Sequence, residues 1–144
     1  MEVLRATKTW QQAGAYYVRI QAMAKKHHIT LREEFDEHDG PETKYIVLLD
    51  DDFPVATARL YPLDDARMVI GRVVVLPEYR HRGLGTQVVR ECEDWARELG
   101  FAKAVLDSRD NKTEFYHKLG YRETGEEVPF DGTFHCVRME KALK

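Results

Sequence analysis

One stretch of the chain decides its fold: Val73-Val74-Val75-Leu76-Pro77-Glu78-Tyr79-Arg80-His81-Arg82-Gly83-Leu84-Gly85-Thr86. It begins in a nearly continuous apolar, β-branched run over residues 68–76, which is typical of a strand buried on both faces. Pro77 ends this strand, and a glycine turn leads into a segment with apolar residues at helical spacing up to Gly100. The stretch therefore predicts a central strand, a tight turn and a helix in succession.

The turn predicts an anion-binding site. The first N–H groups of a helix have no partner within it and lie at the positive end of its dipole. Glycines 83 and 85 let the main chain approach a phosphate, and Arg80 and Arg82 add charged donors. The alternative is an ordinary turn with solvated arginines. A nucleotide-binding module is disfavoured because neither a Walker lysine nor a ribose-binding acidic signature is present.

Composition limits the possible classes of protein. The 144 residues are 43% apolar, enough for a single domain over residues 1–144 with a core that needs no disulfide. The net charge of −3 argues against a nucleic-acid partner. No apolar run is long enough for a membrane span, and no secretory leader is recognisable, so we expect a cytoplasmic protein. Cys92 and Cys136 are in no metal-ligand spacing, and we expect no metal.

The remaining patterns predict a mixed α/β sheet. Helices are expected over residues 9–28, around residues 31–35 and over residues 111–118, and a further strand over residues 101–106. Residues 45–49 and 54–61 predict a hairpin around a turn at 50–52. A second hairpin is expected to join residues 121–128 to 134–139 through Asp131-Gly132.

A second motif makes the pattern specific: Phe115-Tyr116-x-Lys118-x-Gly120-Tyr121. Together with Arg80-x-x-Gly83-x-Gly85, it resembles the two signature motifs of the GNAT superfamily of acetyl-coenzyme A-dependent N-acetyltransferases. Val18-Arg19 and Glu33-Glu34-x-Asp36 are similar to a small bacterial subgroup of uncharacterised acetyltransferases in that superfamily. The resemblance implies a mixed, mostly antiparallel central sheet with a splayed strand, flanked by helices.

The resemblance also implies roles for individual residues. The main chain of Val73, Val74 and Val75 would contact the pantetheine arm of acetyl-coenzyme A, and a backbone N–H near Val74 would polarise the acetyl carbonyl. Tyr116 would donate a proton to the leaving thiolate, although periodicity alone favours a packing aromatic there. The remaining cofactor-binding residues implied are Arg80, His81, Arg82, Gly83, Leu84, Gly85, Thr86 and Asn111.

The general base and the acceptor are less well defined. Many relatives place a glutamate on the central strand, where this chain has Gly71 and Arg72, so that role cannot be carried over. Glu34, Asp36 and Asp107 are candidates, with solvated surface carboxylates as the alternative. Arg72 could point into the acceptor cleft or pair with an acidic residue. Residues 33–43 carry six carboxylates and no lysine or arginine, which suggests either attraction of a cationic amine or a solvated loop.

These observations predict transfer of acetyl from acetyl-coenzyme A to a primary amine of a small molecule or peptide, by direct attack in a ternary complex. The alternative is a non-catalytic acyl-coenzyme A-binding or sensing module. The expected partners are acetyl-coenzyme A and the amine, with no nucleic acid and no membrane. The sequence does not define the oligomeric state, although the resemblance allows a homodimer.

Overall fold

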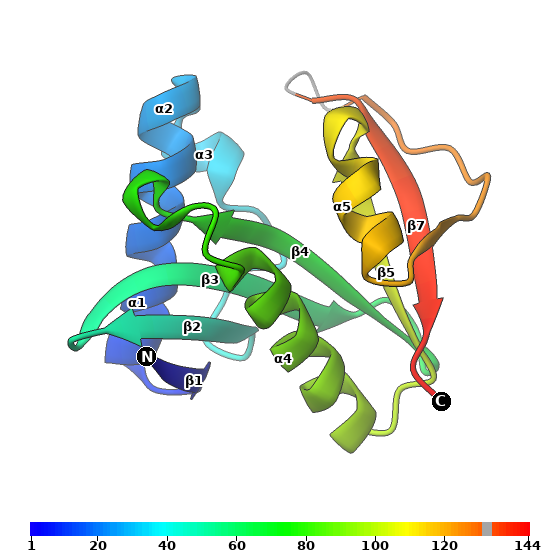
Figure 1. Cartoon of the computed structure of the whole chain (residues 1–144), viewed down its shortest axis with the longest axis horizontal. Coiled ribbons are helices and arrows are strands. Elements are labelled where there is room, and N and C mark those ends of the chain that lie inside the picture. Colours follow the sequence, from blue (N-terminus) through cyan, green and yellow to red (C-terminus); the bar gives the residue numbers. More distant parts are fainter. Residues whose placement is uncertain (131–133) are drawn as a thin grey trace.

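The computed structural model describes residues 1–130 and 134–144, and its strands form one open sheet (Figure 1). The strands are β1 (Glu2–Ala6), β2 (Lys44–Asp50), β3 (Phe53–Pro62), β4 (Arg67–Val75), β5 (Lys103–Arg109), β6 (Arg122–Glu123) and β7 (Cys136–Ala142). The helices are α1 (Thr9–Arg19), α2 (Lys25–His27), α3 (Leu31–Glu34), α4 (Leu84–Glu98) and α5 (Thr113–Lys118). A π-helical turn, η1 (Ile20–Ala24), joins α1 to α2, and 3₁₀ turns η2 (Pro77–Tyr79) and η3 (Asp110–Lys112) precede α4 and α5.

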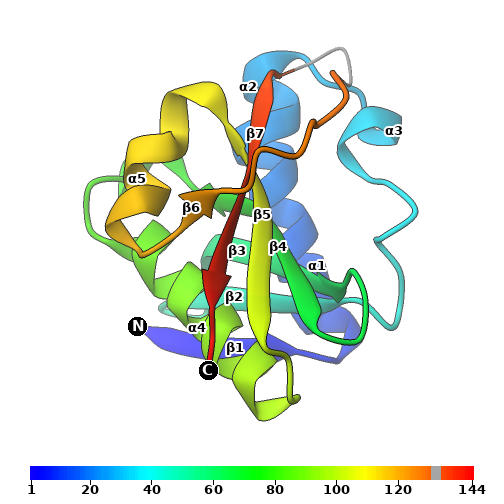
Figure 2. The same cartoon turned by 90° about the vertical axis from the view of Figure 1, so that its right-hand side faces the viewer.

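The strands lie in the order β1-β2-β3-β4-β5-β7-β6. Neighbours are antiparallel except β4 and β5, which are parallel because α4 carries the chain from one to the other. Helices α4 and α5 cover one face of the sheet, and α1, α2 and α3 cover the other (Figure 2). The structure thus confirms the predicted mixed, mostly antiparallel sheet flanked by helices.

Strand β2 is buried on both faces because helices lie above and below it. Ile46 and Leu48 join the main core, whereas Tyr45, Val47 and Leu49 join a smaller core that includes Ala15 of α1. Helix α4 contributes to the main core a buried stripe at helical spacing: Val88, Val89, Cys92, Trp95 and Ala96. Cys92 is fully buried in this core.

Several element boundaries differ from the predictions. Strand β1, which was not predicted, pairs antiparallel with β2. The helix expected over residues 9–28 changes to a π-helical turn at Ile20 and ends at His28, whose φ of 54° is left-handed. The predicted last hairpin is present only as β6 and β7, and β7 extends past the predicted end to Ala142. Its expected turn residues, Asp131 and Gly132, lie outside the described residues.

The parallel pairing of β4 and β5 is short. It covers three residues of each strand, from Arg67–Lys103 to Val69–Val105, and the strands separate beyond that point. On the other edge of β4, the register with β3 shifts between Gly71 and Val74, and Arg72 within this bulge has a φ of 49°. The splayed strand implied by the resemblance is therefore β4, and it opens a gap in the centre of the sheet.

A network of buried ion pairs fastens the connection after α3 to the sheet. Arg19, which is fully buried on α1, pairs with Glu34 at 2.9 Å and with Asp39 at 2.7 Å. Asp39 also accepts hydrogen bonds from Arg59 of β3 and from the hydroxyl of Tyr45 on β2. Burial alone would raise the pKa of Asp39, but these hydrogen bonds outweigh burial and hold the pKa well below its ordinary value.

Two general features of the described residues bear on function. None of their helices has the length and apolar character needed to cross a lipid bilayer. Among the same residues, no three His, Cys, Asp or Glu side chains are grouped as ligands for a metal ion.

We predict that Asp39→Asn lowers the free energy of unfolding by about 3 kcal/mol at neutral pH, because it removes one of the two carboxylate partners of each of the buried Arg19 and Arg59. The pKa of Asp39 is lower in the folded chain than in the unfolded chain, so its contribution is complete above about pH 4 and is lost as the pH falls further. The difference between variant and wild type should therefore shrink below about pH 4 in urea unfolding experiments. The exposed Glu37→Gln is the control; an Asp39→Asn variant as stable as this control would contradict the prediction.

Candidate active site

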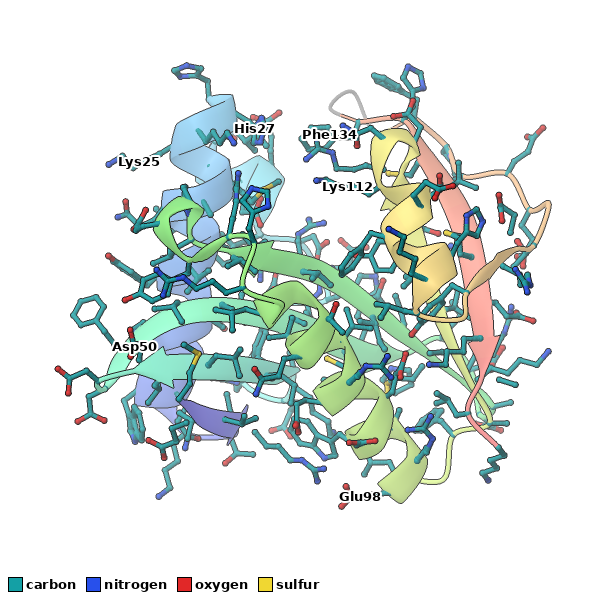
Figure 3. The ribbon with its side chains drawn as sticks, in the orientation of Figure 1. Lys25, His27, Asp50, Glu98, Lys112 and Phe134 are labelled. Carbon is teal, nitrogen blue, oxygen red and sulfur yellow. The ribbon has the colours of Figure 1, made fainter. Side chains whose placement is uncertain are left out.

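The gap between β4 and β5 opens into a cavity of ≈ 650 Å³. Its walls come from β4, the turn before α4, the end of β5 and α5, with η1 and α2 above (Figure 1). Figure 3 shows His27 on α2 and Phe134 beside α5 on opposite sides of its upper part. Their ring centroids lie 5.4 Å apart. The separated strands therefore leave a space into which an extended molecule fits, with backbone groups of β4 along one wall.

The glycine turn presents main-chain donors to this cavity. Gly83 is the N-cap of α4 with a φ of 78°, and no side chain caps the helix. His81 also has a positive φ, of 64°. Positive φ values in a turn can point successive backbone N–H groups toward one concave side. Gly85 lies in the first turn of α4, and a Cβ there would lie 3.4 Å from the ring of Phe115, in van der Waals contact. N–H groups at an uncapped helix start are suited to an anion, and anion binding at this turn stays a prediction.

Tyr116 of α5 lies on the cavity wall and is held by aromatic contacts. Its ring meets Phe115 at 4.9 Å and Tyr121 at 5.9 Å, both edge to face. Tyr121 is in turn fixed by a 2.8 Å hydrogen bond from its hydroxyl to Glu93, which is buried on α4. Burial raises the pKa of Tyr116 to about 12, so its phenol keeps its proton at neutral pH. A protonated phenol at this place can act as a general acid.

Arg72 pairs with acidic residues, one of the two alternatives considered for it, and a role toward the acceptor stays a prediction. It lines the cavity, and its guanidinium donates at 3.0 Å to the backbone carbonyl of Glu34. It also lies 3.4 Å from the Glu34 carboxylate and 3.3 Å from that of Asp36. The bulge that turns Arg72 out of β4 therefore brings it onto the connection that follows α3.

The three carboxylates considered as bases are all paired with arginines. Glu34 lines the cavity but is only 3% exposed, so it is not the solvated carboxylate expected as the alternative. Asp36 is not part of the lining and binds Arg59 at 2.8 Å. Asp107 lines the cavity and is held by Arg138 at 2.9 and 3.2 Å. Each of the three carboxylates therefore has an arginine partner, and none is free to act as a base.

The acidic stretch at residues 33–43 is also less negative than its sequence suggests. Glu34, Asp36 and Asp39 are paired with arginines from α1, β3 and β4: Arg19, Arg59 and Arg72. Of the other three carboxylates in the stretch, only Glu33 lines the cavity. Pairing with arginines therefore offsets three of the six negative charges, and the cationic acceptor stays a prediction.

The cavity collects most residues that the sequence singled out. All those named for cofactor binding line it except Arg82, whose guanidinium lies over the ring of Tyr79. Sequence reasoning did not find His27, Arg109 and Phe134, which also line it. They come from three distant parts of the chain and belong to no motif, so no sequence signal could have grouped them.

Comparisons with known proteins agree with this geometry. Residues 6–121 match the acetyltransferase (GNAT) family. The uncharacterised N-acetyltransferase YjcF of Bacillus subtilis (strain 168) is 28% identical over 141 residues, covering 98% of this chain and 99% of that protein. A crystal structure assigned as an N-acetyltransferase of Lactobacillus plantarum superposes with a TM-score of 0.91 at 31% identity, covering 99% and 98% of the two chains.

A more distant structure shares the fold alone. It is an aminoglycoside 6′-N-acetyltransferase crystallised with coenzyme A, which is 16% identical with a TM-score of 0.80 and coverage of 100% and 98%. The family match covers most of the chain, from the end of β1 to the residue before β6, and includes both motifs. The chain is therefore a member of the GNAT acetyltransferase family, and it is an acyltransferase.

Proposed function

We propose that this protein transfers the acetyl group of acetyl-coenzyme A to a primary amine of a small molecule or peptide, in a ternary complex. One observation carries the proposal: the separated strands, the uncapped start of α4 and Tyr116 border the same cavity. A phosphate site, an extended slot and a buried proton donor are the three features that a coenzyme A thioester requires.

The donor site is built mainly from backbone. The N–H groups at the start of α4 bind the pyrophosphate, with Arg80 adding charge. Val73, Val74 and Val75 lie past the last residue of β4 that pairs with β5, so their β5-facing backbone groups pair with the pantetheine amides. Asn111, in η3 on the opposite wall, adds a polar contact. Acetyl-coenzyme A supplies an activated thioester carbonyl.

The transfer itself needs one general acid. The neutral amine attacks the carbonyl carbon, the C–N bond forms, and a backbone N–H near Val74 stabilises the oxyanion. The C–S bond then breaks, and Tyr116 donates its proton to the departing sulfur. The amide nitrogen loses its extra proton to water, and Tyr116 regains a proton from solvent. No covalent enzyme intermediate forms, and no carboxylate base takes part.

Two measurements test the proposal. Acetyl-coenzyme A and coenzyme A should raise the melting temperature, whereas ATP should not, and thiol release should depend on added amine. Stabilisation by ATP alone would contradict a coenzyme A site. Coenzyme A binding without thiol release across a broad amine panel would contradict the transferase and favour a non-catalytic acyl-coenzyme A-binding module.

We predict that Tyr116→Phe lowers kcat by about 100-fold or more, the ordinary contribution of a general acid, and leaves the KM for acetyl-coenzyme A nearly unchanged. The ring and its aromatic contacts remain, so only the proton is lost. Steady-state kinetics with a free-thiol readout would measure this. Tyr17→Phe, on α1 and outside the cavity lining, is the matched control. A loss of coenzyme A binding equal to the loss in kcat would make Tyr116 structural.

We predict that Gly83→Ala destabilises the protein by about 1–2 kcal/mol and weakens coenzyme A binding. A Cβ meets no atom within 4 Å there, but a φ of 78° is strained for alanine. Relief of that strain would turn the first N–H groups of α4 away from the pyrophosphate. Thermal unfolding and calorimetric titration with coenzyme A measure the two effects. Gly40→Ala, which is equally open and lies outside the cavity lining, should change neither; unchanged affinity in Gly83→Ala would argue against the cradle.

A further inference from the structure

The carboxylates on the cavity wall are already occupied within the described chain. Glu33 accepts hydrogen bonds from the backbone N–H and the hydroxyl of Thr30, at 3.0 and 2.8 Å, in the capping box of α3. Glu34 is paired with Arg19 and Arg72, and Asp107 with Arg138. Among the described residues of the cavity wall, Glu33 is therefore the one carboxylate without an arginine partner, and it is exposed on α3.

Arg109 is different from these paired groups. It is the last residue of β5, and its half-buried guanidinium stacks 4.0 Å from the centre of the Phe134 ring. Within the described residues, no carboxylate lies within ion-pair distance of it. Stacking fixes the plane of a guanidinium and leaves its edge N–H donors available, an arrangement that suits two parallel hydrogen bonds to a carboxylate.

The other cations of the cavity are less suited to hold a substrate anion. Arg72 is bound to Glu34 and Asp36, and Arg80 belongs to the phosphate turn. Lys26 and Lys112 are exposed and flexible. Arg109 instead lies on β5, across the opening from β4 and the turn that follows β4. A group held there would face the donor thioester from the opposite wall.

The local positive charge also favours the reactive form of an amine. Burial, followed by the charges of Arg109, Lys26 and Arg80, lowers the pKa of His27 on the same cavity wall. The same surroundings disfavour an ammonium ion until a bound carboxylate offsets the charge of Arg109. They would repel an acceptor that carries only positive charge.

We propose that the acceptor is an amino-carboxylic acid whose carboxylate binds Arg109 while its amine faces the thioester between β4 and β5. This inference rests on the transferase function proposed above. It assigns the substrate class through a residue that lies in neither family motif. Arg109 would be a specificity-determining residue that acts on the acceptor and has no part in binding coenzyme A.

The test compares α-amino acids with their α-carboxamides in the thiol-release assay, because each pair differs only in the negative charge. The amino acids should have the lower KM. Arg109→Gln should raise the KM for amino acids by about 10- to 100-fold, the ordinary loss for a charged hydrogen-bond pair, and leave the carboxamides nearly unchanged. The KM of Arg109→Lys for amino acids should lie between those of wild type and Arg109→Gln, because lysine keeps the charge but lacks the two parallel N–H donors of a guanidinium. Arg122→Gln, on the exposed strand β6, is the matched control.

Two results would overturn this inference while leaving the transferase intact: carboxamides used as well as amino acids, or a rise in the KM for acetyl-coenzyme A as the main effect of Arg109→Gln. Calorimetric titration of the coenzyme A complex with N-acetylated amino acids and their amides provides a readout without turnover. Tighter binding of the acids, lost in Arg109→Gln, supports the inference. Equal binding of acids and amides contradicts it, whereas thiol release with no amine of any kind contradicts the transferase itself.

Discussion

The early end of the pairing between β4 and β5 is the constraint on which the site depends. A parallel pair that continued to the ends of both strands would bury its own backbone groups and leave no opening. The bulge at Arg72 bends β4 away, and the side chain turned out by the bulge is held by Glu34 and Asp36. The gap is therefore stabilised from the α1–α3 side of the sheet, by residues that line the same cavity as the glycine turn.

That stabilisation comes from ion pairs whose members lie far apart in sequence. Arg19 and Glu34 are almost completely buried, so each costs desolvation energy that only a close, hydrogen-bonded partner offsets. Because Arg19 also holds Asp39, and Asp39 holds Arg59, the connection after α3 is fastened to the centre of the sheet. The network acts as a support for the cavity wall, which explains why its carboxylates are unsuitable as bases.

The parts of the fold that were predictable are those encoded locally. The β-branched run before Pro77, the glycine turn and the apolar stripe of α4 lie next to one another in sequence, and the structure places them as predicted. Strand β1 was missed because Glu2–Ala6 is a short, mixed segment whose pairing with β2 lies about forty residues away, beyond any local pattern. The pairing of Glu34, Asp36 and Asp39 was not predictable for the same reason, since their arginine partners lie on three other elements.

The proposed reaction needs a protonated general acid and a deprotonated amine in the same cavity. The proton donor must keep its proton until the thiolate forms, and burial of Tyr116 against Phe115 and Tyr121 raises its pKa to about 12 for that purpose. The attacking amine must lose its proton beforehand, and positive charge favours that loss. In the proposed reaction, the aromatic surroundings on α5 meet the first demand, and the positive charges around the cavity contribute to the second without a glutamate on the central strand. The central strand carries Gly71 and Arg72 where a glutamate base could stand. Arg72 instead helps to hold the gap open through Glu34 and Asp36. In the proposed reaction the proton of the amine therefore passes to water.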